Sequence, residues 1–298
     1  MFKLGTLQST VLISAMVAAA AAGCRKADDD DASQIGSAVG EVMASVDEAN
    51  QGGMATAMLP ALPILRTPDE LRGPLWRRAI DSVFPSAQAA ACADFHFSAC
   101  DAGTRIRTFS ACSIGLATLD GAVSLAFSSN PLCALASPGD AVTRTGDFTL
   151  TGLYGGTLTV SAPAGGQTLT RTSSGFEYTV GGMERVLKGA GGRTLFDIST
   201  ETTTPIELTG SSRADLVIVS GALKITHHLA GYAVTLTPSN LAWSAQCTCA
   251  VSGSLSGSVS GGKHDGKEAT MTLMGCGDAD VTIDGVTESV TLDRCTAI

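Results

Sequence analysis

Beyond about residue 93, apolar residues alternate with threonine, serine or charged residues in short runs. Because successive side chains of a β-strand point to opposite faces of the sheet, each run predicts a strand with one buried face and one exposed face. Glycine pairs and other turn residues separate the runs at hairpin distances. The runs span residues 148–150, 157–160, 168–170, 176–180, 206–208, 223–226, 232–236, 271–273 and 281–283.

The order of these runs predicts how the strands are connected. No helical pattern recurs between them, which argues against a parallel sheet with crossover helices. The sequence therefore predicts a mainly β fold, an antiparallel meander that forms a sandwich, a barrel or a half-barrel, preceded by one or two N-terminal helices.

Two segments before residue 91 have the period of an amphipathic helix. In residues 33–50, apolar residues spaced by three and four positions form one stripe, which consists of Ile35, Val39, Val42, Met43 and Val46. A second predicted helix follows Thr67, which caps it, with Pro68 in the first turn and Glu70 completing a capping box. This helix ends before Pro85. We expect both helices to pack on or beside the β domain.

The first 23 residues have the features of a secretory signal. Lys3 is the only charged residue before an apolar or small-residue run over residues 11–23, which is shorter than the roughly 20 residues of a membrane-spanning helix. The junction Ala-Ala-Gly-Cys at residues 21–24 resembles the signal of bacterial lipoproteins. The resemblance implies cleavage before Cys24, whose thiol then carries diacylglycerol and whose amine carries a fatty acid such as palmitate. A conventional signal cut near Ala22 would instead leave Cys24 as an ordinary thiol.

A polar segment follows Cys24. Residues 25–31 read Arg-Lys-Ala-Asp-Asp-Asp-Asp and contain almost nothing to bury, so we expect a flexible tether over residues 24–32. In the lipoprotein family an aspartate directly after the cysteine retains the protein in the inner membrane. Arg25 stands at that position, so the resemblance implies an outer-membrane lipoprotein that faces the periplasm or the cell surface.

The charge balance restricts the partners. Of 19 basic and 28 acidic residues, the first 23 residues contain only Lys3, so the mature chain has 18 against 28, a net charge of −10. An acidic surface disfavours nucleic acid and anionic lipid head groups.

Nine cysteines are present, and assigning Cys24 to the lipid leaves eight. An even number in an exported chain predicts a disulfide framework, with each bond contributing about 2–4 kcal/mol to stability. We expect pairing within each of two groups, and the pairing inside each group stays open. The first group is Cys92, Cys100, Cys112 and Cys133, and the second is Cys247, Cys249, Cys276 and Cys295.

The second cysteine group has a competing interpretation. Residues 241–251 alternate as one predicted strand that places Cys247 and Cys249 on the same face. With Cys276 and Cys295 they would form a soft-metal site, since thiolates suit zinc or copper(I). In an oxidising envelope, two disulfides that tie this strand to the C-terminal hairpin are favoured over a metal site.

Histidines and glycine-rich motifs give no catalytic pattern. His96, His227, His228 and His264 have no ligand spacing and are predicted to lie on the surface. Residues 257–263 match the start of a phosphate loop, but His264 stands where Ser or Thr would coordinate magnesium, so we predict an ordinary loop. Residues 253–257 place Leu255 where a nucleophile elbow needs serine. The calcium-loop spacing also fails at Asp278, Asp280 and Asp284, of which the last two are predicted to be solvent-facing strand ends.

These observations predict four segments: a signal peptide (1–23), a tether (24–32), a helical segment (33–90) and a disulfide-stapled β domain (91–298). We expect a non-enzymatic envelope protein, without catalytic residues, metal or cofactor, whose domain has a structural role or binds protein, glycan or lipid. The alternative is an apolar-ligand carrier, with a meander that forms a half-barrel cavity and helices that cover it.

Overall fold

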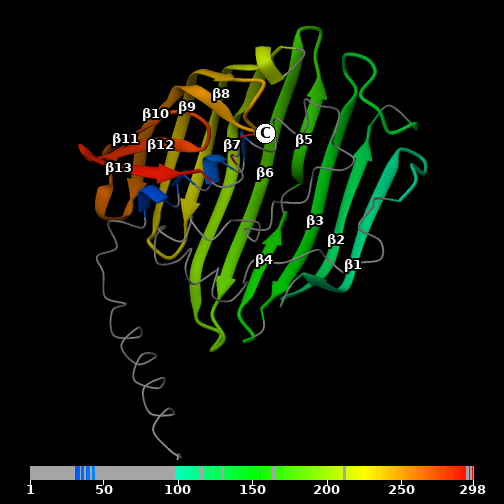
Figure 1. Ribbon diagram of the computed structural model, residues 1–298, viewed down its shortest axis with the longest axis horizontal. Coiled ribbons are helices and arrows are strands. Elements are labelled where there is room, and N and C mark those ends of the chain that lie inside the picture. The colour runs from blue at the N-terminus through cyan, green and yellow to red at the C-terminus, as the bar shows by residue number, and fades with distance from the viewer. Residues whose placement is uncertain are drawn as a thin grey trace, which may run out of the picture.

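The computed structural model (Figure 1) describes two parts of the chain. The described residues are 31–33, 35–36, 38–40, 42–43, 98–114, 117–128, 131–152, 154–162, 165–210, 213–292, 295 and 297. The predicted second helix after Thr67, and also Cys24, Cys92 and His96, lie outside these residues.

Thirteen antiparallel strands form one sheet in the described part of the chain. They are β1 (Thr104–Ile114), β2 (Ala117–Phe127), β3 (Ala141–Thr151), β4 (Thr157–Ser161), β5 (Gly166–Arg171), β6 (Gly175–Lys188), β7 (Thr194–Thr209), β8 (Val217–His227), β9 (Tyr232–Trp243), β10 (Ala250–Gly261), β11 (Glu268–Leu273), β12 (Asp278–Ile283) and β13 (Val286–Thr291). Two 3₁₀ turns, η3 (Arg213–Asp215) and η4 (Gly262–His264), follow β7 and β10. The mainly β, antiparallel meander predicted from the alternating runs is therefore confirmed.

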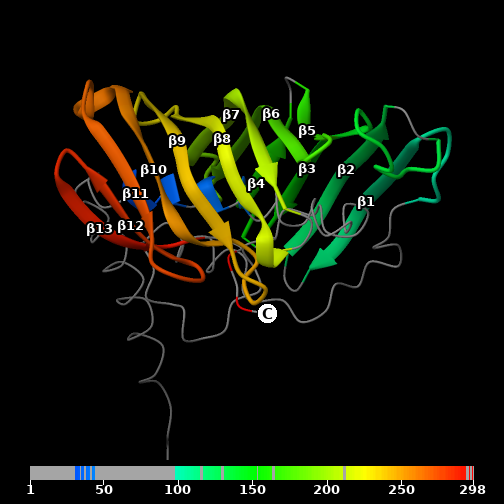
Figure 2. The same cartoon turned by 90° about the horizontal axis from the view of Figure 1, so that it is seen from above.

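The strands follow one another across the sheet with a single exception. β4 and β5 both pair with β3 on one side and with β6 on the other, so they occupy one strand position end to end. β1 and β13 are the outer strands of the sheet. Since all described strands belong to this one sheet, they do not form the sandwich that the sequence left open. Figure 2 shows that the sheet is strongly twisted and curved.

One face of the sheet carries the core. Along most strands buried and partly exposed residues alternate, as in β8, where Ile218, Leu223, Ile225 and His227 are buried. Threonine, serine and charged residues occupy many of the opposite positions, and neighbouring hydroxyls bond across strands, as between Thr143 and Thr168 (3.0 Å). This division follows from the period of two in the sequence.

The N-terminal helix packs against this apolar face. All ten described residues between 31 and 43 are helical and buried. Both views place these residues, drawn in blue, beside β10 to β13. A Cβ on Gly36 would lie 2.9 Å from Cγ2 of Val290, so the glycine allows close contact with β13. The helix predicted from residue 33 is present in the described residues.

Three assignments of residues to segments, made from the sequence, are wrong. Asp31 and Ala32, assigned to the tether, are helical and buried because they pack with the rest of the helix. Residues 241–251 are not one strand, since β9 ends at Trp243 and β10 begins at Ala250. Residues 257–261 belong to β10 rather than to a loop.

Two smaller predictions about side chains also need correction. His227 is buried rather than exposed, because it continues the core-facing positions of β8. Asp280, predicted at a strand end, lies within β12, where its carboxylate accepts a hydrogen bond from the Ser289 hydroxyl (2.6 Å). No helix among the described residues has the length and apolar character needed to cross a membrane.

Candidate functional site

A polar cluster joins the helix to the turns of β8 to β11. The Asp31 carboxylate lies 3.3 Å from Nζ of Lys263 and 4.0 Å from Nε2 of His264. The phenol of Tyr232, the first residue of β9, donates a hydrogen bond to the same carboxylate. We refer to Asp31, Tyr232, Lys263 and His264 as the Asp31 clamp. It fixes the helix to one end of the sheet.

Burial determines the chemistry of this cluster. The Asp31 side chain is only 6% exposed, whereas Lys263 is 39% exposed, so the lysine keeps contact with solvent while it pairs with a buried carboxylate. Burial, together with the negative charge of Asp31, raises the pKa of Tyr232 far above its usual value, so the phenol remains a donor. Nδ1 of His264 is buried without a hydrogen-bond partner in the described part of the chain.

His227 lies next to the clamp. Its Nδ1 accepts a hydrogen bond from the backbone N–H of Ala230 (3.2 Å), and its ring centroid is 5.3 Å from that of Tyr232. Burial lowers the pKa of His227, and the charges of Asp31 and Asp197 oppose this effect without cancelling it. The ring of His228, the next residue, acts in the same direction as burial. The neutral imidazole is therefore favoured in the folded protein.

The lowered pKa of His227 predicts a stability that depends on pH. Because the unfolded chain binds a proton near the ordinary histidine pKa of about 6.5 and the folded chain binds it only at lower pH, acid favours unfolding. The stabilisation that comes from keeping His227 neutral should be fully present above about pH 6.5 and decrease as the pH falls through the pKa of His227 in the folded protein. Denaturant unfolding between pH 7.5 and 5 should show this slope, and His227→Gln should reduce it.

His228→Gln is the matched control for this experiment. His228 is exposed, and its Nε2 lies 3.1 Å from the Ser199 hydroxyl. An equal loss of slope in both variants would contradict the role assigned to burial of His227.

Cys247, Cys249, Cys276 and Cys295 form a second cluster, at the opposite end of β9 and β10. Disulfides join Cys247 to Cys276 and Cys249 to Cys295, while Cys100 is joined to Cys133. Each of these bonds joins members of one sequence group, and Cys112 is also disulfide-bonded. Since the four sulfurs of the second group form disulfides, they are not the thiolates that a soft-metal site needs. The disulfide bonds expected in an exported chain are thus present.

The helix contacts the Cys249–Cys295 disulfide through the backbone carbonyl of Gly40. The sulfurs of Cys249 and Cys295 lie 3.7 Å and 3.9 Å from the carbonyl oxygen of Gly40. Gly36 and Gly40 are one helical turn apart, so two residues without side chains face β13 and this disulfide. The contact places the stapled C-terminal segment directly on the helix.

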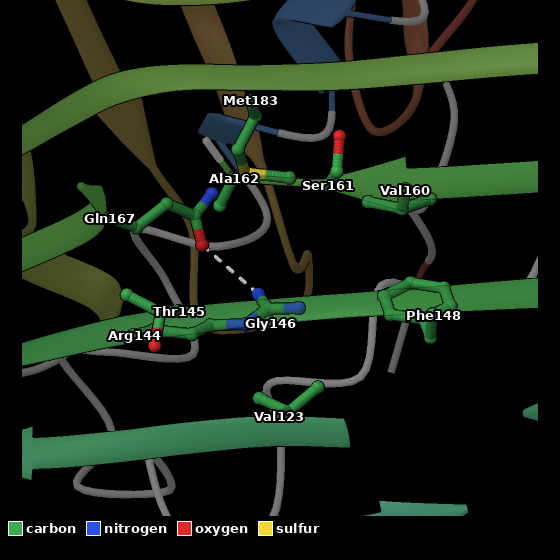
Figure 3. A pocket seen from close by; sticks show the side chains of 10 residues that line it. All are labelled: Val123, Arg144, Thr145, Gly146, Phe148, Val160, Ser161, Ala162, Gln167 and Met183. Carbon is green, nitrogen blue, oxygen red and sulfur yellow. Dashed lines mark hydrogen bonds between the residues drawn. The ribbon is translucent and has the colours of Figure 1, made fainter. Parts of the chain in front are cut away.

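A small cavity lies on the core side of the other half of the sheet (Figure 3). Nη1 of Arg144 in β3 donates a hydrogen bond to Oε1 of Gln167 in β5 (3.0 Å), and both side chains are buried. Phe148 and Met183 contribute to the apolar part of the lining. The cavity volume is about 10 Å³, which is close to the space of one water molecule and far below that of a lipid.

Sequence reasoning missed Arg144 and Gln167, although a signal for Arg144 is present. Arg144 shares the core-facing frame of β3 with Phe148 and Leu150, where an apolar residue is expected. A charged residue in a buried frame marks a polar contact inside the core. Nothing in residues 163–167 predicts that Gln167 is its partner.

Among the residues that the structure describes, no group of three or more His, Cys, Asp or Glu side chains is arranged to hold a metal ion. No family model, curated protein or solved structure matches this chain.

Proposed function

We propose that this chain is an exported lipoprotein of the bacterial envelope, anchored to the outer membrane through Cys24. Its role is non-enzymatic, and its β domain serves as a rigid binding or structural module. The disulfide framework is the observation that carries the proposal, because such bonds persist in oxidising compartments outside the cytosol. The apolar run over residues 11–23 and its junction with Cys24 supply the export signal.

The outer face of the sheet is the proposed binding surface for a protein or glycan. It presents hydroxyl groups in cross-strand pairs, such as Thr149 with Thr159 (3.3 Å) and Thr282 with Thr287 (2.7 Å). Charged pairs such as Lys224 with Glu201 (2.8 Å) lie among them. A hydroxylated face with paired charges favours polar partners over apolar ones.

Intact-mass measurement tests the anchor. Protein from an exporting bacterial host should lack residues 1–23 and carry a diacylglycerol thioether on Cys24. Cys24→Ser should abolish the lipid mass and release the protein from the membrane fraction. An unmodified Met1 in the wild-type protein, or a free Cys24 thiol after cleavage, would overturn the proposal.

The second candidate function is transport of an apolar ligand, which the apolar face of the curved sheet favours. The helix of residues 31–43 occupies part of that face, and the cavity beside Arg144 is too small for a lipid. Organic extraction of the purified protein distinguishes the two functions. About one equivalent of a non-covalent lipid would support transport, whereas covalent lipid alone supports the anchored module.

A further inference from the structure

The turns at the clamped end of the sheet carry exposed apolar residues. Leu229, between β8 and β9, is 52% exposed, and Val286, which begins β13, is 64% exposed. The turn of β10 and β11 lies between these two in strand order and contains Lys263 and His264 of the Asp31 clamp. Figure 1 shows the three turns at the left of the view, in yellow, orange and red. We call residues 228–231, 262–267 and 284–286 the clamp end.

We propose that the clamp end faces the lipid bilayer, with Leu229 and Val286 in the head-group region. The inference rests on the proposed lipid anchor at Cys24 and adds the orientation of the domain to it.

The position of Asp31 limits the distance between the clamp end and the membrane. Asp31 is the first described residue of the helix, and its carboxylate is held by Lys263 and Tyr232. It follows Cys24 by seven residues, which span at most about 25 Å when fully extended. A lipid on Cys24 therefore keeps the clamp end within about 25 Å of the bilayer surface.

The far end of the same strands is much less favourably placed. β8 spans Val217–His227, which is about 33 Å at the usual rise of a strand. Gly40, which contacts the Cys249–Cys295 disulfide at that end, is about 13 Å from Asp31 along the helix, so a domain with its far end on the bilayer would hold Asp31 about 20 Å from the surface, close to the full reach of the seven residues. The short connection thus favours the orientation in which the clamp end, which contacts Asp31 directly, lies nearest the lipid.

The charges of the clamp end suit a lipid interface. Nζ of Lys267 lies 2.9 Å from Oδ1 of Asp284, Lys263 pairs with Asp31, and the exposed Asp265 accepts a hydrogen bond from the backbone N–H of Gly261 (2.6 Å). The two lysines of these turns are therefore balanced by their two aspartates. Moving exposed apolar side chains out of water lowers the free energy by about 25 cal/mol per Å² of buried surface. Apolar tips among balanced charges match the zwitterionic head groups of phosphatidylethanolamine, whereas the mature chain's charge of −10 opposes anionic lipids.

Tryptophan quenching by brominated lipid tests the orientation. The full chain, expressed in an exporting host and extracted in detergent, is reconstituted into phosphatidylethanolamine and phosphatidylcholine vesicles with brominated acyl chains. Leu229→Trp is compared with Val219→Trp, because both native residues are 52% exposed and Val219 lies near the far end of β8. The parent chain corrects for native Trp76 and Trp243.

We expect at least twofold stronger quenching at position 229 than at position 219, together with a blue-shifted emission. In the Asp31→Asn background the quenching at 229 should fall, because the asparagine cannot form the ion pair with Lys263. Quenching at 229 that is unchanged by Asp31→Asn would overturn the part assigned to the clamp.

The anchor and the orientation fail in different ways. If intact mass shows lipid on Cys24 but positions 229 and 219 are quenched equally, the orientation is wrong and the proposed function stands. If Cys24 carries no lipid, the proposed function is wrong and the orientation fails with it. Unchanged disulfide content and unchanged far-ultraviolet circular dichroism establish that each variant is folded.

Discussion

Replacing Cys249 and Cys295 together by alanine is expected to lower the free energy of unfolding by about 3–5 kcal/mol. The two cysteines are 46 residues apart, so their bond removes considerable entropy from the unfolded chain. Both sulfurs are also buried, and both contact the carbonyl of Gly40 in the helix. The loss of the bond thus removes a restraint on the unfolded chain and a packing contact of the folded one. Urea unfolding monitored by circular dichroism measures the change.

Cys100 and Cys133 provide the matched control. Their separation of 33 residues gives a similar entropic contribution, but both side chains are only partly buried. Cys100 precedes β1, and Cys133 lies in the loop between β2 and β3. We expect the double alanine variant to lose about 2–3 kcal/mol, less than the buried pair. An equal or larger loss at this loop would show that contact with the helix adds nothing to the Cys249–Cys295 bond.

The alternating pattern predicted strands well where β-branched and aromatic residues mark it. β6 and β9 contain the predicted runs 176–180 and 232–236, and both are longer than the runs because the pattern weakens at their ends. β10 was missed because its core-facing residues Leu255 and Val259 are separated by serine and glycine. In this strand the two neighbours supply the pairing that its own propensity does not predict.

Contacts between distant residues were the part that the sequence did not predict. Asp31 belongs to an acidic run typical of a solvated tether, and only its pairing with Lys263, 232 residues later, explains its burial. His227 was assigned to the surface because it ends a predicted strand and the histidines of the chain have no ligand spacing. In the fold it faces Tyr232 across a strand pair and continues the core frame.

The burial of Cys247 and Cys249 was predicted correctly, but from a strand over residues 241–251 that does not form. Cys247 and Cys249 are both buried and both disulfide-bonded, as two residues on one face would be. They lie in the connection between β9 and β10 rather than inside a strand. Counting cysteines predicted that each of these bonds joins members of one group, whereas the partners inside a group came only from the fold.

Gly257→Ala is expected to destabilise the fold by about 3 kcal/mol, an unusually large effect for the addition of one methyl group. Gly257 lies in β10 opposite Leu236 of β9 and Ala269 of β11, in the core-facing frame of Leu255 and Val259. A Cβ at this position would overlap the backbone carbonyl oxygen of Thr235, so the methyl group has to displace a strand rather than a flexible side chain. Urea unfolding of the variant measures the loss.

Gly191→Ala is the control that separates this backbone collision from a general cost of replacing glycine. Gly191 lies in the turn between β6 and β7, where a Cβ would have no heavy atom within 4 Å and the φ angle lies outside the left-handed region. This variant should stay within about 0.5 kcal/mol of the parent. A loss at Gly257 no larger than that at Gly191 would mean that β9 and β10 move apart without cost. The sheet would then be too compliant to hold the Asp31 clamp, which joins the ends of those same two strands, in a fixed position.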